Sequence, residues 1–240
     1  MADLLDAFAS YIKRKNLLPE EPALLILGLS AGVDSACLLD LFCRYRKEYR
    51  QDLFLVIHHQ DHRIRDLTAE KDRLLVQEWA KNRLIPCFVD IDDVPLLADN
   101  NKKNLEDQAR QVRYHNWRKL LEELQKNSDY KACKTYGIAT AHHASDQAET
   151  ILLHLAYGAG LDGLKGILPK RDCFIRPLLF ATKEQLYAYA KDRKLTWRED
   201  ETNLDTDYRR NFLRHELLPL WQEREEKNLG LSLARSAENL

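Results

Sequence analysis

From residue 23 to residue 157, short apolar runs alternate with longer amphipathic segments. The apolar runs predict buried strands at residues 23–29, 53–59, 87–91 and 136–143. The segments near residues 35–48, 67–83, 104–126 and 146–157 have the longer apolar spacing of helices. Strands that alternate with helices of this length predict an open parallel α/β sheet, flanked by helices and joined by right-handed crossovers.

The two ends of the chain have different patterns. The N-terminal stretch MADLLDAFASYIKRKN is amphipathic, starts with acidic residues and has no cleavage site, so it predicts a helix and no signal peptide. After Gly166 we expect a short strand in CFIRPLL, a helix opened by Thr182, and an amphipathic segment in YRRNFLRHELLPLWQE. The polar tail predicts a linker helix. The expected organisation is one catalytic domain over residues 1–218 and a linker helix over 219–240.

Composition narrows the class of protein. No apolar run approaches the roughly 20 residues that a membrane-spanning helix needs. Five cysteines are scattered without a C-x-x-C pair, which favours reduced thiols in the cytoplasm and disfavours a zinc ribbon. The formal net charge of 240 residues is −1, so an RNA partner would have to be bound through local basic patches.

Polar residues follow each predicted strand. The first strand runs into SAGVDS, the second into HHQDHRIR, the third into DIDD and the fourth into AHHASDQAET. In open parallel sheets, ligands bind outside the carboxyl ends of the strands. The sequence therefore predicts one site at this edge of the sheet.

The loop SAGVDS between the first strand and its helix has the small side chains of an anion site. Small residues let the backbone turn tightly, and the free N–H groups at the start of the helix attract phosphate. The loop has neither the lysine of a Walker P-loop nor the G-x-G-x-x-G dinucleotide fingerprint. Ser30 and Ser35 would hold a pyrophosphate, and Asp34 would bind its Mg²⁺. A structural alternative is a tight turn with an Asp-Ser cap.

A serine hydrolase is the chemical alternative. Gly28, Ser30 and Gly32 spell G-x-S-x-G, the nucleophile elbow. That elbow normally follows several strands, whereas only one helix is predicted before this loop. The hydrolase interpretation also leaves Asp34 and Ser35 without a role.

With these residues the chain resembles the PP-loop (N-type ATP pyrophosphatase) superfamily, whose signature is S-G-G-x-D-S, and within it the tRNA(Ile)-lysidine synthetase family. Further stretches carry the narrower resemblance in the family's order: HHQDHRIR (58–65), NLEDQARQVRYHN (104–116), AHHASDQAETILLHLAYGAGLDGLKGI (141–167), IRPLL (175–179) and WREDETNLDTDYRRNFLRHELLP (197–219). The matching segments cover nearly the whole chain.

The resemblance implies an ATP-dependent ligase with Mg²⁺. Such an enzyme adenylates the wobble cytidine of tRNA-Ile with a CAU anticodon and releases pyrophosphate. Free L-lysine then displaces AMP to give lysidine. A different PP-loop enzyme, such as a tRNA thiolase, would need cysteines arranged for persulfide or cluster chemistry. A catalytically weakened ATP- or RNA-binding protein is the third interpretation.

The resemblance and the chemistry together assign candidate residues. The nucleotide-binding set is Ser30, Ala31, Gly32, Val33, Asp34, Ser35, His58 and His142; the catalytic set is Asp34, Arg113, Asp146, Glu149 and Arg210; the magnesium ligands are Asp34 and Asp146. Asp146 and Glu149 lie three residues apart on a predicted helix, share a face and would receive the lysine amine. The alternative is two solvated helix charges.

Arginines and histidines are less specific. Arg113 shares a helix stripe with Glu106 and Arg110, where a simple Glu106–Arg110 ion pair is the alternative. Arg210, with its neighbours Arg209 and Arg214, would stabilise phosphate charge or hold the tRNA backbone, or form an ordinary basic surface. The strand-end histidines lack the spacing of a helical zinc site and are expected to line the nucleotide pocket.

Four positions depart from the family pattern. Gln60 and Asp61 replace a Val-Asn or similar pair in the histidine segment. Ala31 replaces a glycine, which would be strained if the loop needed φ > 0 there. Ser145 replaces an aspartate beside Asp146. Many family members continue into further tRNA-binding domains, so we expect that the chain alone binds ATP better than tRNA.

Overall fold

The computed structural model of the 240-residue chain describes residues 3–64, 66–199, 212–225 and 228–240. Its strands are β1 (Ala23–Gly28), β2 (Leu53–Asp61), β3 (Cys87–Ile91), β4 (Thr135–Thr140), β5 (Lys170–Arg171) and β6 (Phe174–Ile175). Its helices up to the second half of the sheet are α1 (Leu4–Arg14), α2 (Val33–Glu48), α3 (Asp66–Arg83), α4 (Val94–Asn101), α5 (Leu105–Lys126) and η1 (Ser128–Tyr130). The later helices are α6 (Ala144–Ala156), α7 (Leu161–Leu164), α8 (Lys183–Asp192), η3 (Leu213–Leu217), α10 (Leu218–Glu225) and α11 (Leu229–Glu238).

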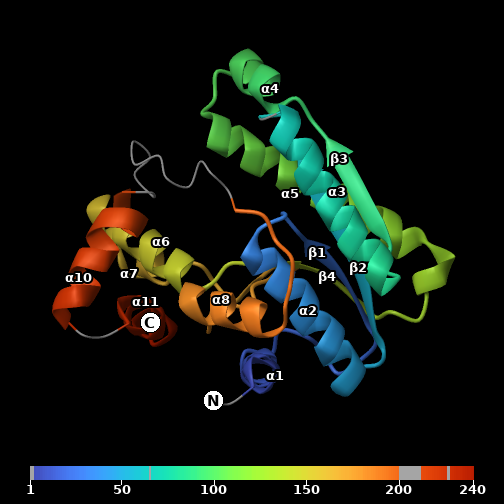
Figure 1. Cartoon of the computed structure of the whole chain (residues 1–240), viewed down its shortest axis with the longest axis horizontal. Helices are drawn as coiled ribbons and strands as arrows, with labels where there is room; N and C mark the ends of the chain where they lie inside the picture. The colour runs from blue at the N-terminus through green and yellow to red at the C-terminus, as the bar shows by residue number, and fades with distance from the viewer. Residues whose placement is uncertain (1–2, 65, 200–211, 226–227) are drawn as a thin grey trace.

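Six strands of the described chain form one sheet in the order β3-β2-β1-β4-β6-β5. Figure 1 labels the four longer strands, β1 to β4. β1 lies parallel to both β2 and β4, with Ala23 opposite Leu53 on one side and Thr135 on the other. The short edge strand β5 pairs antiparallel with β6. The predicted open parallel α/β sheet is confirmed.

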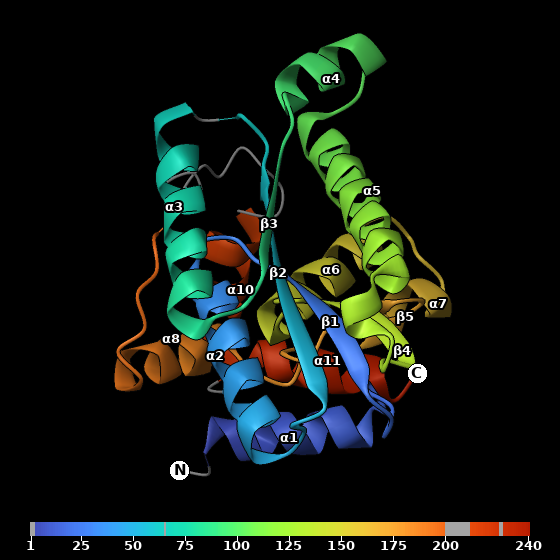
Figure 2. The ribbon, with the colours of Figure 1, turned by 90° about the vertical axis from the view of Figure 1, so that its right-hand side faces the viewer.

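The central strand shows why helices cover both faces of the sheet. Leu25 and Leu27 point into a core shared with α1, α2, α3 and α8. Leu24 and Ile26, one position out of phase, point into a second core built on α5. Figure 2 shows α5 on one side of the strands and α2 and α3 on the other. Because both faces are buried, β1 reads as a continuous apolar run.

Two expected strands are shorter in the structure. The strand predicted at 136–143 ends at Thr140, because His143 is already the N-cap of α6. The strand expected in CFIRPLL is limited to Phe174–Ile175, since Pro177 has no N–H to donate to a ladder. Helix α4 was missed by the sequence pattern: it has only 8 residues, although Asp93 caps it.

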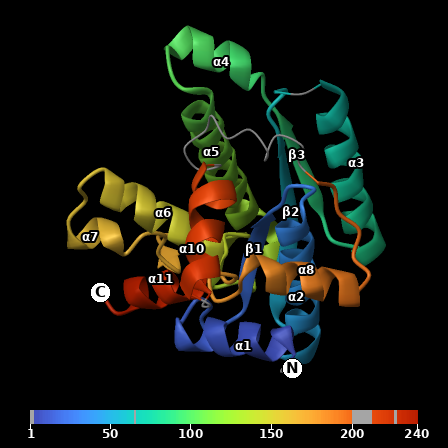
Figure 3. The same ribbon diagram turned by 60° about the vertical axis from the view of Figure 1, so that its left-hand side comes forward.

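The C-terminal segment contains more than one helix. α10 is followed by α11, which begins with Asn228 as its cap and packs against α6 (Figure 3). Ala234 and Ala237 are the buried side chains of α11. None of the helices in the described part of the chain combines the length and apolar character that crossing a membrane requires.

The strand order reverses between β1 and β4. From β1 the chain runs outward through β2 to β3, then returns to place β4 on the other side of β1. In doubly wound folds, ligands bind outside the carboxyl ends of the strands at such a switch point, and we call this place the crevice. The loop before α2 and the loop before α6 both begin there.

Candidate active site

The loop after β1 is held from two sides through its carbonyl groups. His59 on β2 donates from Nδ1 to the Leu29 carbonyl over 2.9 Å. The backbone N–H of Arg198 donates to the Ala31 carbonyl, also over 2.9 Å. Within the loop, the N–H groups of Leu29 and Ser30 are also engaged, by the His58 carbonyl at 2.9 Å and by Ser35 Oγ at 3.0 Å. The amides left to face a ligand are therefore those of the first turn of α2.

Helix α2 begins without a capping side chain. Gly32 is its N-cap and makes no side-chain cap, whereas α1, α4, α5, α6, α8 and α11 each have one. Ser30 and Ser35 join across the loop, with 3.1 Å between their hydroxyl oxygens, and Ser35 Oγ accepts from the Ser30 N–H at 3.0 Å. The first turn of α2 therefore offers N–H groups toward the crevice, as an anion site requires.

Ala31 is accommodated without backbone strain. It is absent from the residues of positive φ in the described chain, and its side chain is buried in the core under α2. The strain that we considered for this position does not occur, because the loop needs no left-handed residue there. Glycine is required instead at the end of β1, where a Cβ on Gly28 would lie 2.3 Å from the Trp117 ring.

Asp34 is the acidic residue of the loop, and its main partner comes from α8. Lys183 Nζ lies 2.7 and 2.9 Å from the two carboxylate oxygens of Asp34. His143 Nε2 lies 3.8 Å from the same carboxylate. Asp34 thus meets residues that follow β4 and β6, far away in the sequence.

His143 connects Asp34 to Asp146. The Ser145 N–H donates to His143 Nδ1 over 3.2 Å, which places the imidazole proton on Nε2. That nitrogen is 3.5 Å from Asp146, whose carboxylate also accepts from the His143 backbone N–H at 2.9 Å. Burial opposes ionisation of Asp146, but the neighbouring histidines, this backbone donor and Arg214 together lower its pKa.

Asp146 and Glu149 share one face of α6, as their spacing predicted. Arg214 binds Glu149 with two nitrogens, at 2.7 and 3.0 Å, and approaches Asp146 at 3.4 Å. Glu149 is almost fully buried, and burial raises its pKa despite the arginine. Arg214 is presented by η3, which is a π-helical turn. Such turns often occur at functional sites.

The two predicted histidines lie in different surroundings. His58 is 1% exposed, accepts from Trp117 Nε1 at 2.9 Å and has Asp90 at 2.9 Å from its other ring nitrogen. Both nitrogens are therefore engaged by the protein, and the structure places His58 in the core. His142 is half-buried at the end of β4, within 2.8 Å of the Thr140 hydroxyl. Burial lowers the pKa of His142 to about 4.

Arg113 faces the same region from α5. Its guanidinium carbon lies 5.9 Å from the centre of the Trp117 ring, and its Nε is buried without a hydrogen-bond partner among the described residues. Burial lowers the pKa of Arg113, and its charge helps to lower that of His142. The structure thus brings Arg113 near the end of β4. Arg210 lies outside the described residues.

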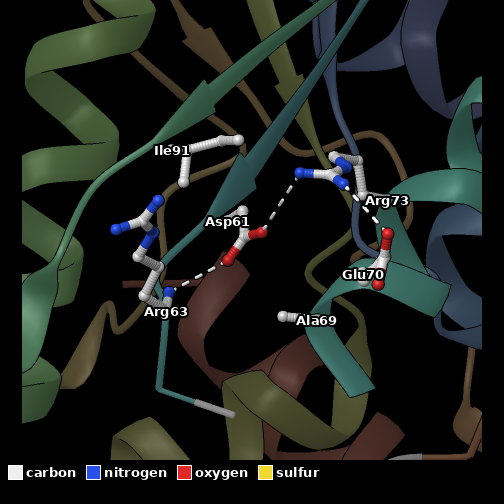
Figure 4. A pocket seen from close by; sticks show the side chains of 6 residues that line it. All are labelled: Asp61, Arg63, Ala69, Glu70, Arg73 and Ile91. Atoms are coloured by element: carbon white, nitrogen blue, oxygen red, sulfur yellow. Dashed lines mark hydrogen bonds and ion pairs between the residues drawn. The ribbon is translucent and has the colours of Figure 1, made fainter. Parts of the chain in front are cut away.

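A pocket of about 240 Å³ lies beside this edge, between α3 and the end of β2 (Figure 4). In Figure 4 the Asp61 carboxylate sits between the backbone of Arg63 and the guanidinium of Arg73. It accepts from the Arg63 N–H at 2.9 Å and lies 4.0 Å from Arg73. None of the residues assigned from the sequence lines this pocket.

An uncapped phosphate-type loop at the switch point of a parallel sheet, with an acidic residue in its first helical turn, defines the PP-loop class of nucleotide-binding domain. The chain matches the PP-loop domain family over residues 7–221, and it belongs to that family. Family membership also decides between the two interpretations of G-x-S-x-G. Ser30 belongs to a PP-loop and is not a nucleophile elbow, and its hydroxyl forms a hydrogen bond with the Ser35 hydroxyl.

Curated relatives of known activity match almost all of the chain. It is 36% identical to the tRNA(Ile)-lysidine synthase of Thermosipho africanus over 93% of its length. It is 34% identical to that of Clostridioides difficile over 99%, and 35% identical to that of Porphyromonas gingivalis over 95%. It covers 49%, 49% and 47% of these relatives, so the chain spans about half the length of the curated relatives it matches.

A solved structure shows the same fold. The U34-tRNA thiolase NcsA from Methanococcus maripaludis superposes with a TM-score of 0.70, covering 98% of this chain and 80% of that one, at 16% identity. The likeness extends to the fold alone. The five cysteines of this chain are all free, and burial raises the pKa of Cys37 to about 12, which disfavours a reactive thiolate there.

Several residues that build the site were missed from the sequence. Lys183 was predicted only as part of a helix. His143 was grouped with the strand-end histidines and Arg214 with the phosphate-binding or RNA-binding arginines, and neither was expected to contact the carboxylates of α6. A sequence signal for His143 does exist. It precedes α6 as the N-cap and Asp146 follows three residues later, which is the spacing of a capping box. Nothing in the local pattern connects Lys183 to Asp34, because 149 residues separate them.

Proposed function

We propose that this chain forms the ATP-using part of a tRNA(Ile)-lysidine synthase. In this reaction ATP adenylates the wobble cytidine of tRNA-Ile with a CAU anticodon, and the ε-amine of free lysine then displaces AMP. Family membership supports the use of ATP, and the identity with named lysidine synthases supports the substrate. The observation that carries the proposal is that Asp34 of the loop and Asp146 of α6 both approach the same nitrogen of His143.

The residues at the loop fit a magnesium nucleotide. Magnesium takes oxygen ligands and is usually held by one or two carboxylates together with phosphates and water. Asp34 is a quarter exposed and Asp146 nearly so, and both approach the same His143 nitrogen. We assign these two carboxylates to the metal and residues 30–35 to the phosphates. Bound magnesium would neutralise charge on the departing pyrophosphate.

The α6 carboxylates suit the lysine step because their pKa values are displaced in opposite directions. Asp146, with its lowered pKa, stays an anion that attracts the ε-ammonium. Glu149, with its raised pKa, is the better acceptor for the proton that the amine must lose before it attacks. Arg214 holds Glu149 in place through two hydrogen bonds.

The remaining assigned residues take supporting roles in this proposal. Arg113 is a half-buried cation whose Nε is buried and has no hydrogen-bond partner among the described residues, and we assign it to a phosphate or to the RNA. His142, neutral near pH 7, lines the nucleotide side of β4. His58 positions Trp117 against Gly28 and so shapes the loop from below. Arg210 remains a proposed phosphate contact.

Lysine incorporation tests the proposal. The protein is incubated with ATP, radiolabelled lysine and an isoleucine tRNA transcript with a CAU anticodon. We expect incorporation that depends on ATP and tRNA and is abolished by Asp34→Ala and by Glu149→Ala. Asp162→Ala is the matched control, since that carboxylate is almost fully exposed and pairs only with Lys165 among the contacts described for it.

Two outcomes would contradict the proposal. One is ATP binding with no incorporation at saturating tRNA, which favours a weakened nucleotide-binding protein. The other is a labelled tRNA product that contains sulfur and no lysine, which favours the thiolase. Full activity in both site variants would show that the wrong carboxylates have been assigned.

A further inference from the structure

Lys183 forms an ion pair with Asp34, the carboxylate that the proposed function assigns to the metal. The ammonium contacts both carboxylate oxygens, at 2.7 and 2.9 Å. Both side chains are reachable from solvent, with 25% of Asp34 and 33% of Lys183 exposed. A carboxylate engaged at both oxygens by an ammonium cannot at the same time offer them fully to a divalent cation.

The pair is poorly explained as a stabilising contact. Partly exposed ion pairs contribute only about 0–1 kcal/mol to stability. Lys183 is also the first residue of α8, after the Thr182 cap, where the positive end of the helix dipole disfavours a cation. The position of the lysine therefore indicates a role in the site.

Helix α8 is docked on α2 without Lys183. Leu186 is fully buried and its carbonyl accepts from the Cys37 thiol. Further along, the Tyr189 hydroxyl donates to Asp40 over 2.6 Å. The ammonium can thus leave Asp34 by rotation of its four-carbon side chain while the helix stays in place.

We propose that Lys183 is an exchange cation for the nucleotide site, an inference that rests on the proposed function. Without ligand it neutralises Asp34 and keeps the carboxylate in position. When magnesium and the nucleotide bind, Asp34 passes to the metal and the ammonium pairs with a phosphate oxygen. The number of paired charges is conserved in the exchange, so neither state leaves a lone charge in the crevice.

The exchange predicts opposite effects on metal and nucleotide. Lys183→Met keeps the length of the side chain and removes its charge. Binding of Mn²⁺ alone, followed by the paramagnetic signal of the free ion, should tighten because the competitor for Asp34 is gone. Binding of a non-hydrolysable ATP analogue with magnesium, followed by calorimetry, should weaken about tenfold, which is one charge-assisted contact. Lys191→Met, on the same helix and exposed, should change neither.

Two results would overturn the inference. If Lys183→Met weakens binding of both Mn²⁺ and the ATP analogue, the lysine only keeps the Asp34 side chain in position. If neither affinity changes, Lys183 is a surface residue without a role in the site. Thermal unfolding checks that the variant is folded, and Lys183→Gln replaces it if methionine lowers stability. A wild-type protein that binds no ATP analogue would refute the proposed function itself, whereas normal wild-type binding with unchanged variants refutes the exchange alone.

Discussion

The two ends of the contact between α2 and α8 use the same chemistry in different surroundings. At one end Asp40 accepts from the Tyr189 hydroxyl at 2.6 Å and from Arg193 at 3.2 Å. At the other end Asp34 binds Lys183. The Asp40 side chain is 9% exposed, against 25% for Asp34.

The different burial of Asp40 and Asp34 gives their ion-pair partners different roles. A buried carboxylate that loses its donors keeps the full cost of desolvation, so the Asp40 contacts join the helices. A reachable carboxylate can exchange one cation for another at little cost, so Asp34 is free to serve a ligand. Sequence position does not separate these roles, since both residues lie on α2 with partners on α8.

The largest difference is expected in activity. Asp34→Asn preserves shape and removes the charge. If Asp34 is the metal ligand that we propose, lysine incorporation should fall by about 10³-fold or more. Asp40→Asn should retain near-normal activity per folded molecule. Initial rates under saturating ATP, normalised to folded protein, give the comparison. Equal losses in the two variants would contradict it.

Stability should show the reverse order. Asp40→Ala leaves Tyr189 and Arg193 without their buried acceptor, and we expect the free energy of unfolding to drop by about 3 kcal/mol. Asp34→Ala removes a partly exposed pair and should cost less than about 1 kcal/mol. Urea denaturation of both variants measures the difference, and a larger loss in Asp34→Ala would reverse the assignment of roles.

The sheet edge beside Asp34 should also carry a pH dependence. The folded pKa of His142 is about 4, below its ordinary value of 6.5, so the unfolded state binds the proton more tightly. This histidine therefore contributes stability in full above pH 6.5, and that contribution is lost as the pH falls toward 4. Between pH 7 and 4.5 we expect the wild type to lose about 2 kcal/mol more than His142→Gln. Equal losses of unfolding free energy in the wild type and in His142→Gln over this pH range would contradict the assignment to His142.

The smallest expected effect isolates one contact of the Asp40 end. Tyr189→Phe removes only the hydroxyl that donates to Asp40, and Arg193 still pairs with the carboxylate. We expect a loss of about 1 kcal/mol in unfolding free energy and unchanged nucleotide affinity. A change in nucleotide affinity would show that the two ends of the interface are coupled.

Much of the fold was predictable because its determinants are local. The buried run of β1, the periodicity of α2 and the caps at Asn104 and Thr182 act within a few residues. The end of β4 was misjudged, since the apolar pattern does not reveal that His143 caps a helix. The C-terminal tail was expected to be a linker helix, and helices α10 and α11 do lie there. The burial of Ala234 and Ala237 on α11 was not foreseen, because these side chains are too small to give a strong apolar signal.

Within the candidate site, the residues of the loop and the pair Asp146–Glu149 were predictable, because each lies within one segment. The partners of these residues were not. Lys183, Arg214 and the donor that holds Leu29 come from elements distant in sequence. Likewise, His58 and His142 occupy similar strand ends in the sequence, and only their neighbours separate a core histidine from one at the crevice.

By itself, the sequence determined the parallel α/β fold, the PP-loop and the acidic side chains available for chemistry, since backbone propensity and short spacing act locally. The tertiary structure alone decided which cation pairs with each carboxylate and which carboxylate is buried. Burial in turn decides which carboxylate can release its partner. Burial and pairing depend on surfaces brought together from the whole chain, and no local pattern contains them.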